Sequence, residues 1–154
     1  MTTYFTDSSA LVKRYISENG SPWVRNIANP VSGNSLIIAQ ITWVEVISAL
    51  ARRQREGTIS ISDVNKLITD FRTDFNTQYQ VITLDKIITD LAGELILQYP
   101  LKAYDAVQLA SAIEIQRILR TNYGINLVFL TADNRLLNIA QTLGLVTDNP
   151  NIHP

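Results

Sequence analysis

Four acidic side chains lie at points of the sequence where carboxylates could act together. Asp7 and Asp133 each follow a short run of β-forming residues, and Glu45 and Asp105 lie near the start of long stretches with helical periodicity. Two carboxylates about 4 Å apart repel each other by roughly 4 kcal/mol at an effective dielectric near 20. Proton uptake or a bound divalent cation relieves this repulsion. If the fold brings the four residues together, they form a candidate metal site.

The rest of the composition restricts such a site to oxygen ligands. The chain has no cysteine and a single histidine, His153, close to the last residue. Thiolate catalysis is therefore excluded, and a histidine base or a histidine-rich metal site is disfavoured unless the last residues fold back. Oxygen ligands select hard ions, so we expect Mg²⁺ or Mn²⁺ rather than zinc. Such an ion lowers the pKa of a water molecule and polarises a phosphate, which permits phosphodiester hydrolysis without histidine or cysteine.

Each acid also has a purely structural explanation. An acidic side chain near a helix N-terminus caps free amides and interacts favourably with the helix dipole. Thr42 and Glu45 even have the spacing of a capping box. Within a metal site, we expect Asp7 and Asp105 to hold the principal ion. Glu45 would position the attacking water or complete the coordination, and Asp133 would bind directly or through water.

Basic and aromatic residues near the acids could contact a nucleic acid. Lys13, Arg14, Lys102 and Arg135 lie close to the acids in sequence and could contact phosphates, although a solvated helix face explains them equally well. Three further arginines are better explained by the C-terminal end of their helix: Arg52, Arg53 and Arg55. Three aromatic residues could stack on unpaired bases, but core packing or a partner interface is favoured for them: Trp23, Trp43 and Tyr104.

The elements that must position these residues alternate along the chain. Short β-rich runs separated by helical stretches are typical of a parallel sheet covered by helices. The expected strands are Thr3–Thr6, Leu36–Ile38, Tyr79–Leu84, Asn126–Thr131 and Leu145–Thr147. The expected helices are Ser8–Tyr15, Trp23–Ala28, Thr42–Glu56, Ser60 or Ser62 to Asn76, Asp85–Gln98, Ala103–Thr121 and Asn134–Leu143. The carboxyl ends of parallel strands face one crevice, and Asp7 and Asp133 would point into it.

Length and composition indicate one packed domain. The 154 residues, 46% of them hydrophobic, suit a single domain over residues 1–148, followed by a tail over residues 149–154. The net charge of −1 supplies no general attraction for nucleic acid, so binding would depend on a local basic patch. We find no basic leader and no apolar segment long enough to span a bilayer, so we expect no membrane partner and a cytoplasmic location.

Four sequence segments around these acids, in this order, resemble the PIN-domain ribonucleases. The similarity is strongest to VapC-type toxins of toxin–antitoxin pairs and covers nearly the whole chain. The segments are Tyr4-Phe5-Thr6-Asp7-Ser8-Ser9-Ala10-Leu11-Val12-Lys13, Val44-Glu45-Val46-x-x-Ala49-Leu50, Tyr104-Asp105-Ala106-x-x-Leu109-Ala110-Ser111-Ala112 and Phe129-Leu130-Thr131-Ala132-Asp133-x-x-Leu136.

The resemblance implies a three-layer α/β/α sandwich on a short parallel sheet, with Asp7, Glu45, Asp105 and Asp133 as the acidic residues of a Mg²⁺-dependent or Mn²⁺-dependent endoribonuclease. It also implies assistance from Ser8 or Ser9 and from Thr131. The expected partners are an RNA substrate, a cognate antitoxin and a second copy of the chain in a homodimer. One departure is Gln108, where similar sequences often have a histidine, and this puts an auxiliary polar contact or the choice of substrate in question.

Two other functions remain open at this stage. A noncatalytic PIN-like module would bind a partner and use its acids as helix caps. Another metal-dependent phosphoryl-transfer enzyme, such as a small phosphatase or a DNA nuclease, would use the same metal chemistry. Metal binding would exclude the first alternative, and a comparison of RNA, DNA and phosphomonoester substrates would exclude the second.

Overall fold

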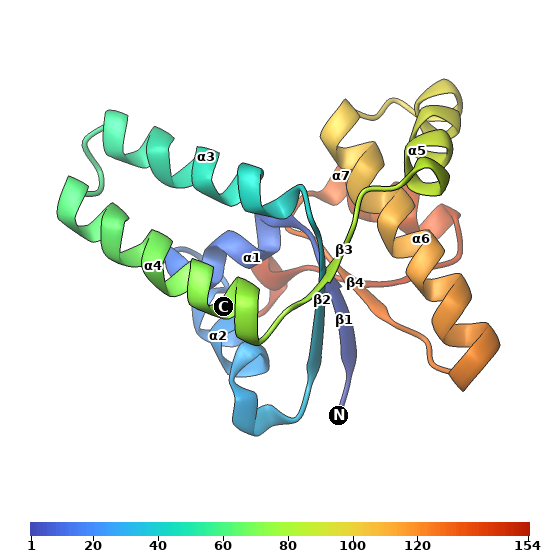
Figure 1. Ribbon diagram of the computed structural model, residues 1–154, viewed down its shortest axis with the longest axis horizontal. Helices are drawn as coiled ribbons and strands as arrows, with labels where there is room; N and C mark the ends of the chain where they lie inside the picture. The colour runs from blue at the N-terminus through green and yellow to red at the C-terminus, as the bar shows by residue number, and fades with distance from the viewer.

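The computed structural model describes residues 1–154 and has a parallel five-stranded sheet between two layers of helices (Figure 1). The strands are β1 (Thr3–Thr6), β2 (Ser35–Ala39), β3 (Gln80–Ile82), β4 (Val128–Leu130) and β5 (Val146–Asp148). The helices are α1 (Ser8–Tyr15), α2 (Ser21–Ala28), α3 (Thr42–Arg55), α4 (Ile61–Thr77), α5 (Lys86–Gln98), α6 (Ala103–Tyr123) and α7 (Asn134–Thr142), with short 3₁₀ helices at Pro30–Ser32 and Pro150–Ile152. The predicted α/β/α sandwich is confirmed.

In the strand order β3-β2-β1-β4-β5 there is one point where the direction in which strands are added to the sheet reverses. The chain builds outward from β1 through β2 to β3 and then returns to the other side of β1 with β4 and β5. Ligands of open α/β sheets bind beyond the carboxyl ends of the strands at such a switch point. Here it lies between β1 and β4, and these strands end immediately before Asp7 and shortly before Asp133.

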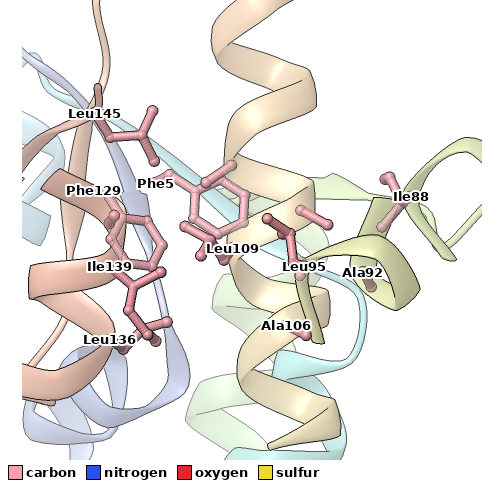
Figure 2. Close-up of a cluster of buried hydrophobic side chains, with 14 of the residues drawn as sticks. Phe5, Ile88, Ala92, Leu95, Ala106, Leu109, Phe129, Leu136, Ile139 and Leu145 are labelled. Atoms are coloured by element: carbon pink, nitrogen blue, oxygen red, sulfur yellow. The ribbon is translucent and has the colours of Figure 1, made fainter. Parts of the chain in front are cut away.

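Both faces of the sheet are buried because each face carries its own hydrophobic core. In β2, Ile37 and Ala39 face a core shared with α5, α6 and α7, while Leu36 and Ile38 face α1, α3 and α4. This alternation follows the two-residue period of a strand. Figure 2 shows the first core, in which Phe5 and Phe129 stack at 6.0 Å beside Leu109 of α6. Strands buried on both faces explain the nearly continuous apolar runs in the sequence.

All predicted element boundaries agree with the structure to within two residues, and differences of two occur at strand ends and at the ends of α2 and α6. The strand predicted at Tyr79–Leu84 is limited to Gln80–Ile82, which pairs with Ile37–Ala39 of β2. The strand predicted at Asn126–Thr131 is limited to Val128–Leu130, because the backbone N–H of Leu127 donates to Gln116 rather than to a neighbouring strand.

The last residues fold back onto the domain. Asn149 and Pro150 are buried, the His153 ring stacks on Trp23 with centroids 4.1 Å apart, and its Nε2 lies 2.9 Å from Oδ1 of Asp148. Residues 149–154, which we expected to form a tail, are thus packed against α2. None of the helices has the length and apolar character that a membrane crossing requires.

Candidate functional site

Asp7 is the most deeply buried of the four acids. It directly follows β1 and caps α1, since its Oδ1 accepts the backbone N–H of Ala10 at 3.0 Å. The hydroxyls of Ser9 and Thr131 donate to its two oxygens, each at 2.7 Å. Burial nevertheless raises the pKa of Asp7 to about 7, with a smaller contribution from the charge of Glu45, and the three hydrogen bonds only partly oppose this rise.

The hydroxyls around Asp7 connect the loops that follow β1 and β4. Thr131 Oγ1 accepts the backbone N–H of Asp133 at 3.1 Å while donating to Asp7. Ser9 Oγ accepts the backbone N–H of Ala132 at 2.9 Å. These contacts join residues more than 120 positions apart in sequence and fix the two loops on either side of the switch point. The expected assistance from Ser9 and Thr131 thus has a geometric basis.

Glu45 is held in place by side chains from two other helices. Ser8 Oγ of α1 donates to its Oε2, and Gln108 Nε2 of α6 donates to its Oε1, both at 2.8 Å. The same Gln108 nitrogen also lies 2.8 Å from Thr42 Oγ1. Helix α3 begins at Thr42 itself and has no side-chain cap. The capping box suggested for Thr42 and Glu45 is therefore absent, and Glu45 is oriented by tertiary contacts.

Asp105 lies close enough to Asp133 for the charge of Asp133 to act on it. Asp105 accepts no hydrogen bond from the protein, and burial together with the negative charges of Asp133 and Glu45 raises its pKa. The cations of Lys102 and Arg135 oppose this rise. Asp133 caps α7 through Oδ1, which accepts the backbone N–H groups of Arg135 and Leu136, and its Oδ2 has no protein partner.

The acids lie close enough for their charges to interact, but they do not enclose a metal-binding cage. No three acidic or histidine side chains stand close enough together to enclose a metal ion. Mg²⁺ does not require such a cage, because it usually keeps several waters and binds through one or two carboxylates together with substrate phosphates. The free carboxylate of Asp105 and the raised pKa of Asp7 and of Asp105 fit a hard divalent cation at this edge of the sheet.

The basic residues expected around the crevice divide into two groups. Lys13 is buried and contacts Glu18 and the carbonyl of Asn19, and Arg14 contacts Tyr79 and Asp74. Neither is free to contact a ligand phosphate, so the expectation for these two was wrong. Lys102 and Arg135 are exposed and face Asp105 closely enough to affect its pKa. Only this second pair lies beside the acids.

The aromatic residues also differ from one another. Trp43 stacks on Phe71 at 5.0 Å. Trp23 stacks on His153 and meets Tyr4 edge to face, so both tryptophans have protein partners, as favoured from the sequence. Tyr104 is 57% exposed and does not pack in the core. The sequence also did not reveal that Gln108 contacts Glu45. Its position three residues after Asp105, on the same face of α6, was the available signal.

Comparisons with known proteins agree with this geometry. The family model described as "PIN domain" matches residues 4–141. A comparison with curated protein sequences finds no match.

Solved structures with the same fold cover most of the chain. VapBC2 from Rickettsia felis, bound to a DNA fragment from its promoter, is 14% identical with a TM-score of 0.63 over 96% of this chain and 98% of that one. A toxin–antitoxin complex from Klebsiella pneumoniae is 18% identical with a TM-score of 0.62 over 96% and 97%. VapC20 from Mycobacterium tuberculosis, described as a toxin that cleaves the sarcin–ricin loop, is 13% identical with a TM-score of 0.62 over 93% and 96%.

Proposed function

Because the chain belongs to the PIN-domain family, we propose that it is a divalent-metal-dependent endoribonuclease and the toxin component of a type II toxin–antitoxin system. The main support is the meeting of the loops after β1 and β4, where Thr131 donates to Asp7 and accepts the backbone N–H of Asp133. Beside this contact, burial and the charges of Asp133 and Glu45 raise the pKa of Asp105. Residues far apart in sequence thus place like charges at the switch point of the sheet, and a cation is the natural means of offsetting their repulsion.

Asp7 and Asp105 hold the cation in this proposal, and Asp133 contributes through its free Oδ2. When bound, the cation supplies the positive charge that polarises the scissile phosphate and lowers the pKa of the attacking water. Glu45 orients that water, because hydrogen bonds from Ser8 and Gln108 hold both carboxylate oxygens of Glu45 in place. Ser9 and Thr131 keep Asp7 in its rotamer through their hydroxyls. The exposed cations of Lys102 and Arg135 contact the phosphates on either side.

The proposed partners follow from the same family. Two of the similar structures are described as a toxin–antitoxin complex and as a sarcin–ricin loop cleaving toxin, which supports an antitoxin as the protein partner and RNA as the substrate. A homodimer acting in the cytoplasm is the assembly we propose. An antitoxin that inserts a cationic side chain among Asp7, Asp105 and Asp133 would inhibit the enzyme, because it would offset the same repulsion as the metal ion.

Parallel digestion of single-stranded RNA, DNA and a phosphomonoester in Mg²⁺ tests the activity. We expect cleavage of RNA alone, loss of cleavage in EDTA, and loss of at least about a hundred-fold in Asp105→Asn, in line with the removal of a major electrostatic contribution. Asp63→Asn is the matched control, because Asp63 is an exposed acid in the first turn of α4. Full activity of Asp105→Asn would refute the proposal.

A noncatalytic binding module is the second candidate, and two observations favour it. Asp7 and Asp133 both cap helices, and no three acids form a metal cage. Calorimetric titration with Mn²⁺ separates the two candidates. A nuclease binds Mn²⁺ and loses this binding in Asp105→Asn, whereas a module whose acids serve as caps binds no metal in either form.

A further inference from the structure

A groove runs away from the acidic site along one face of α3. It has a volume of about 230 Å³ and is lined by Val44, Glu45, Ser48, Ala49, Arg52 and Tyr104. We call it the α3 groove. Glu45, Ser48, Ala49 and Arg52 follow the spacing of residues on one helix face, and Tyr104 forms the opposite wall from the start of α6. Because Glu45 lines it, the α3 groove adjoins the candidate active site.

Apart from Glu45, which Ser8 and Gln108 hold, the polar side chains of the α3 groove have no partners within the protein. Arg52 makes no ion pair and no side-chain hydrogen bond, in contrast to its neighbour Arg53, which pairs with Glu18 at 2.8 Å. Tyr104 exposes 57% of its surface. Ser48 is exposed as well, and its hydroxyl has no bond. The α3 groove therefore combines a free cation, a free aromatic face and free hydroxyls beside Glu45.

We propose that the α3 groove binds the nucleotide next to the scissile phosphate of a single-stranded RNA, a subsite that rests on the proposed function. Tyr104 stacks on the base, and Arg52 contacts the phosphate on the far side of that nucleotide. Glu45 and Arg52 lie about 10 Å apart along the axis of α3, so the guanidinium group of Arg52 lies well beyond the acidic site. Stacking on Tyr104 requires an unpaired base face, which selects a single strand.

A neighbouring hollow provides a useful contrast. It has a volume of about 490 Å³, five of its eight lining residues are hydrophobic, and it shares Val44 with the α3 groove. Its arginine, Arg72, lies over the Trp43 ring at 4.6 Å. The small residues, free hydroxyls and free cation of the α3 groove suit a nucleotide, whereas the walls of this hollow suit apolar protein side chains.

The test measures RNA binding separately from cleavage. Fluorescence anisotropy with a labelled single-stranded RNA of mixed sequence is recorded in the Asp7→Asn background, which the proposed function makes unable to cleave. Tyr104→Ala and Arg52→Ala are compared with Tyr123→Ala and Arg120→Ala. The controls remove an exposed tyrosine and an exposed arginine near the other end of α6, about 25 Å from its start.

We expect Tyr104→Ala to weaken binding about ten-fold, Tyr104→Phe to preserve it, and both controls to match the parent protein. Arg52→Ala should reduce the slope of log Kd against log salt by about 0.7, the value for one phosphate contact on a single strand. Retention by Tyr104→Phe shows that an effect of Tyr104→Ala comes from the ring and not from the hydroxyl. The same substitutions in the active protein should raise KM and leave kcat nearly unchanged.

Four outcomes decide the matter. If Tyr104→Ala and Arg52→Ala bind RNA as their controls do, the subsite is refuted even where the wild-type protein cleaves RNA. Absence of RNA binding by the Asp7→Asn parent protein refutes it as well. The subsite is also refuted if Tyr104→Ala and Arg52→Ala weaken the binding of a protein partner but not that of RNA. If RNA binding depends on Tyr104 and Arg52 while the wild-type protein cleaves no RNA, the subsite stands and the proposed function fails.

Discussion

Asp7 caps α1, and the proposed function requires the same carboxylate to bind a cation. As a helix cap it is well bonded, with donors from Ser9, Ala10 and Thr131. Full burial of a negative charge outweighs these bonds and leaves the group half-protonated near neutral pH. An acid that served only as a cap would be more stable at the surface. The buried position therefore costs free energy of folding, and a bound cation would offset this cost.

The first prediction concerns the pH dependence of stability without metal. The pKa of Asp7 is about 7 in the folded protein against an ordinary value of 3.8. The folded state therefore binds the proton of Asp7 more tightly than the unfolded state does. The stabilisation from protonated Asp7 is fully present below about pH 4 and is lost as the pH rises through about 7. The loss reaches a few kcal/mol, because each ten-fold difference in proton affinity is worth about 1.4 kcal/mol.

Asp7→Asn should remove this dependence and increase the unfolding free energy at pH 8, since asparagine also caps helices well. Urea unfolding in EDTA at several pH values measures the effect. Added Mg²⁺ should stabilise the wild-type protein at pH 8 and leave Asp7→Asn unchanged. A mutant that is less stable than wild type at pH 8 would contradict the prediction.

The second prediction concerns the support of Glu45. Gln108→Leu keeps the side-chain volume but removes the donor to Oε1 of Glu45, so the carboxylate is less well oriented. We expect kcat for RNA cleavage to fall about ten-fold with little change in KM, the loss typical of a hydrogen bond to a charged group. Ser8→Ala should have a similar effect through Oε2. Because both residues act through one carboxylate, the double mutant should lose less than the product of the two single effects.

At the scale of elements, a tyrosine cluster joins α1 to α4 and β3. The hydroxyls of Tyr15 and Tyr79 bond each other, Tyr15 donates to Asp74 at 2.7 Å, and Arg14 donates to Tyr79 at 2.7 Å. Burial is the main cause that raises the pKa of both tyrosines, that of Tyr79 to about 12. The cluster thus stays protonated at neutral pH, and it fixes α1, which carries Asp7, Ser8 and Ser9 at its start.

The third prediction follows from this cluster. Tyr79→Phe leaves Arg14 and Tyr15 each without one partner and should lower the unfolding free energy by about 1–2 kcal/mol, the usual cost of a lost buried hydrogen bond. RNA cleavage at 25 °C should be nearly unchanged, because Tyr79 lies far from Asp7 at the other end of α1. Denaturant unfolding gives the difference, and Tyr123→Phe, exposed on α6, is the control expected to show none.

The same elements show what could be predicted from sequence. Branched runs and helix starts placed all five strands and the turns that carry Asp7, Glu45, Asp105 and Asp133, because these signals are local. The ends of β3 were not predictable, since its length depends on the three residues of β2 that pair with it. Tyr79 was assigned to that strand by its β propensity, but its backbone N–H donates to the carbonyl of Asp74 in α4 and not to a strand.

The side-chain partners in the site were harder to predict than its position. Lys13 and Arg14 looked like substrate contacts because they follow Asp7 by less than two helical turns. Their partners, Glu18 on a loop and Asp74 on α4, are set by the packing of separate elements. Gln108 could be placed on the same helix face as Asp105, but its bond to Glu45 requires the crossing of α6 and α3. Long-range contacts of this kind leave no periodic signal.

At the scale of the whole molecule, the C-terminal turn is held by a close approach to α2. A Cβ on Gly20 would lie 2.4 Å from the carbonyl oxygen of Pro150, and Gly20 has a φ of +85°. The chain therefore has no space for a side chain where its last residues cross the start of α2. This contact, together with the stack of His153 on Trp23, keeps β5 and its following turn against the domain.

The fourth prediction tests this closure. Gly20→Ala should lower the unfolding free energy by about 2–4 kcal/mol, because steric overlap with Pro150 adds to the strain of a positive φ. Gly144→Ala is the matched control, with a φ of +89° and open space around it, and should lose about 1 kcal/mol. Thermal unfolding of both variants gives the comparison. Equal losses would show that Gly20 matters only through its backbone conformation.

The position of β4 in the sheet has a consequence during synthesis on the ribosome. β1 can pair with β2 early, but its other neighbour, β4, begins only at residue 128, and Thr131 reaches Asp7 across 124 positions. A nascent chain that has emerged only as far as α6 carries Asp7, Glu45 and Asp105 but neither the loop that joins them nor Asp133. Fragments released by ribosomes that stall before this point therefore lack a complete acidic centre, so the proposed activity requires translation at least through Asp133.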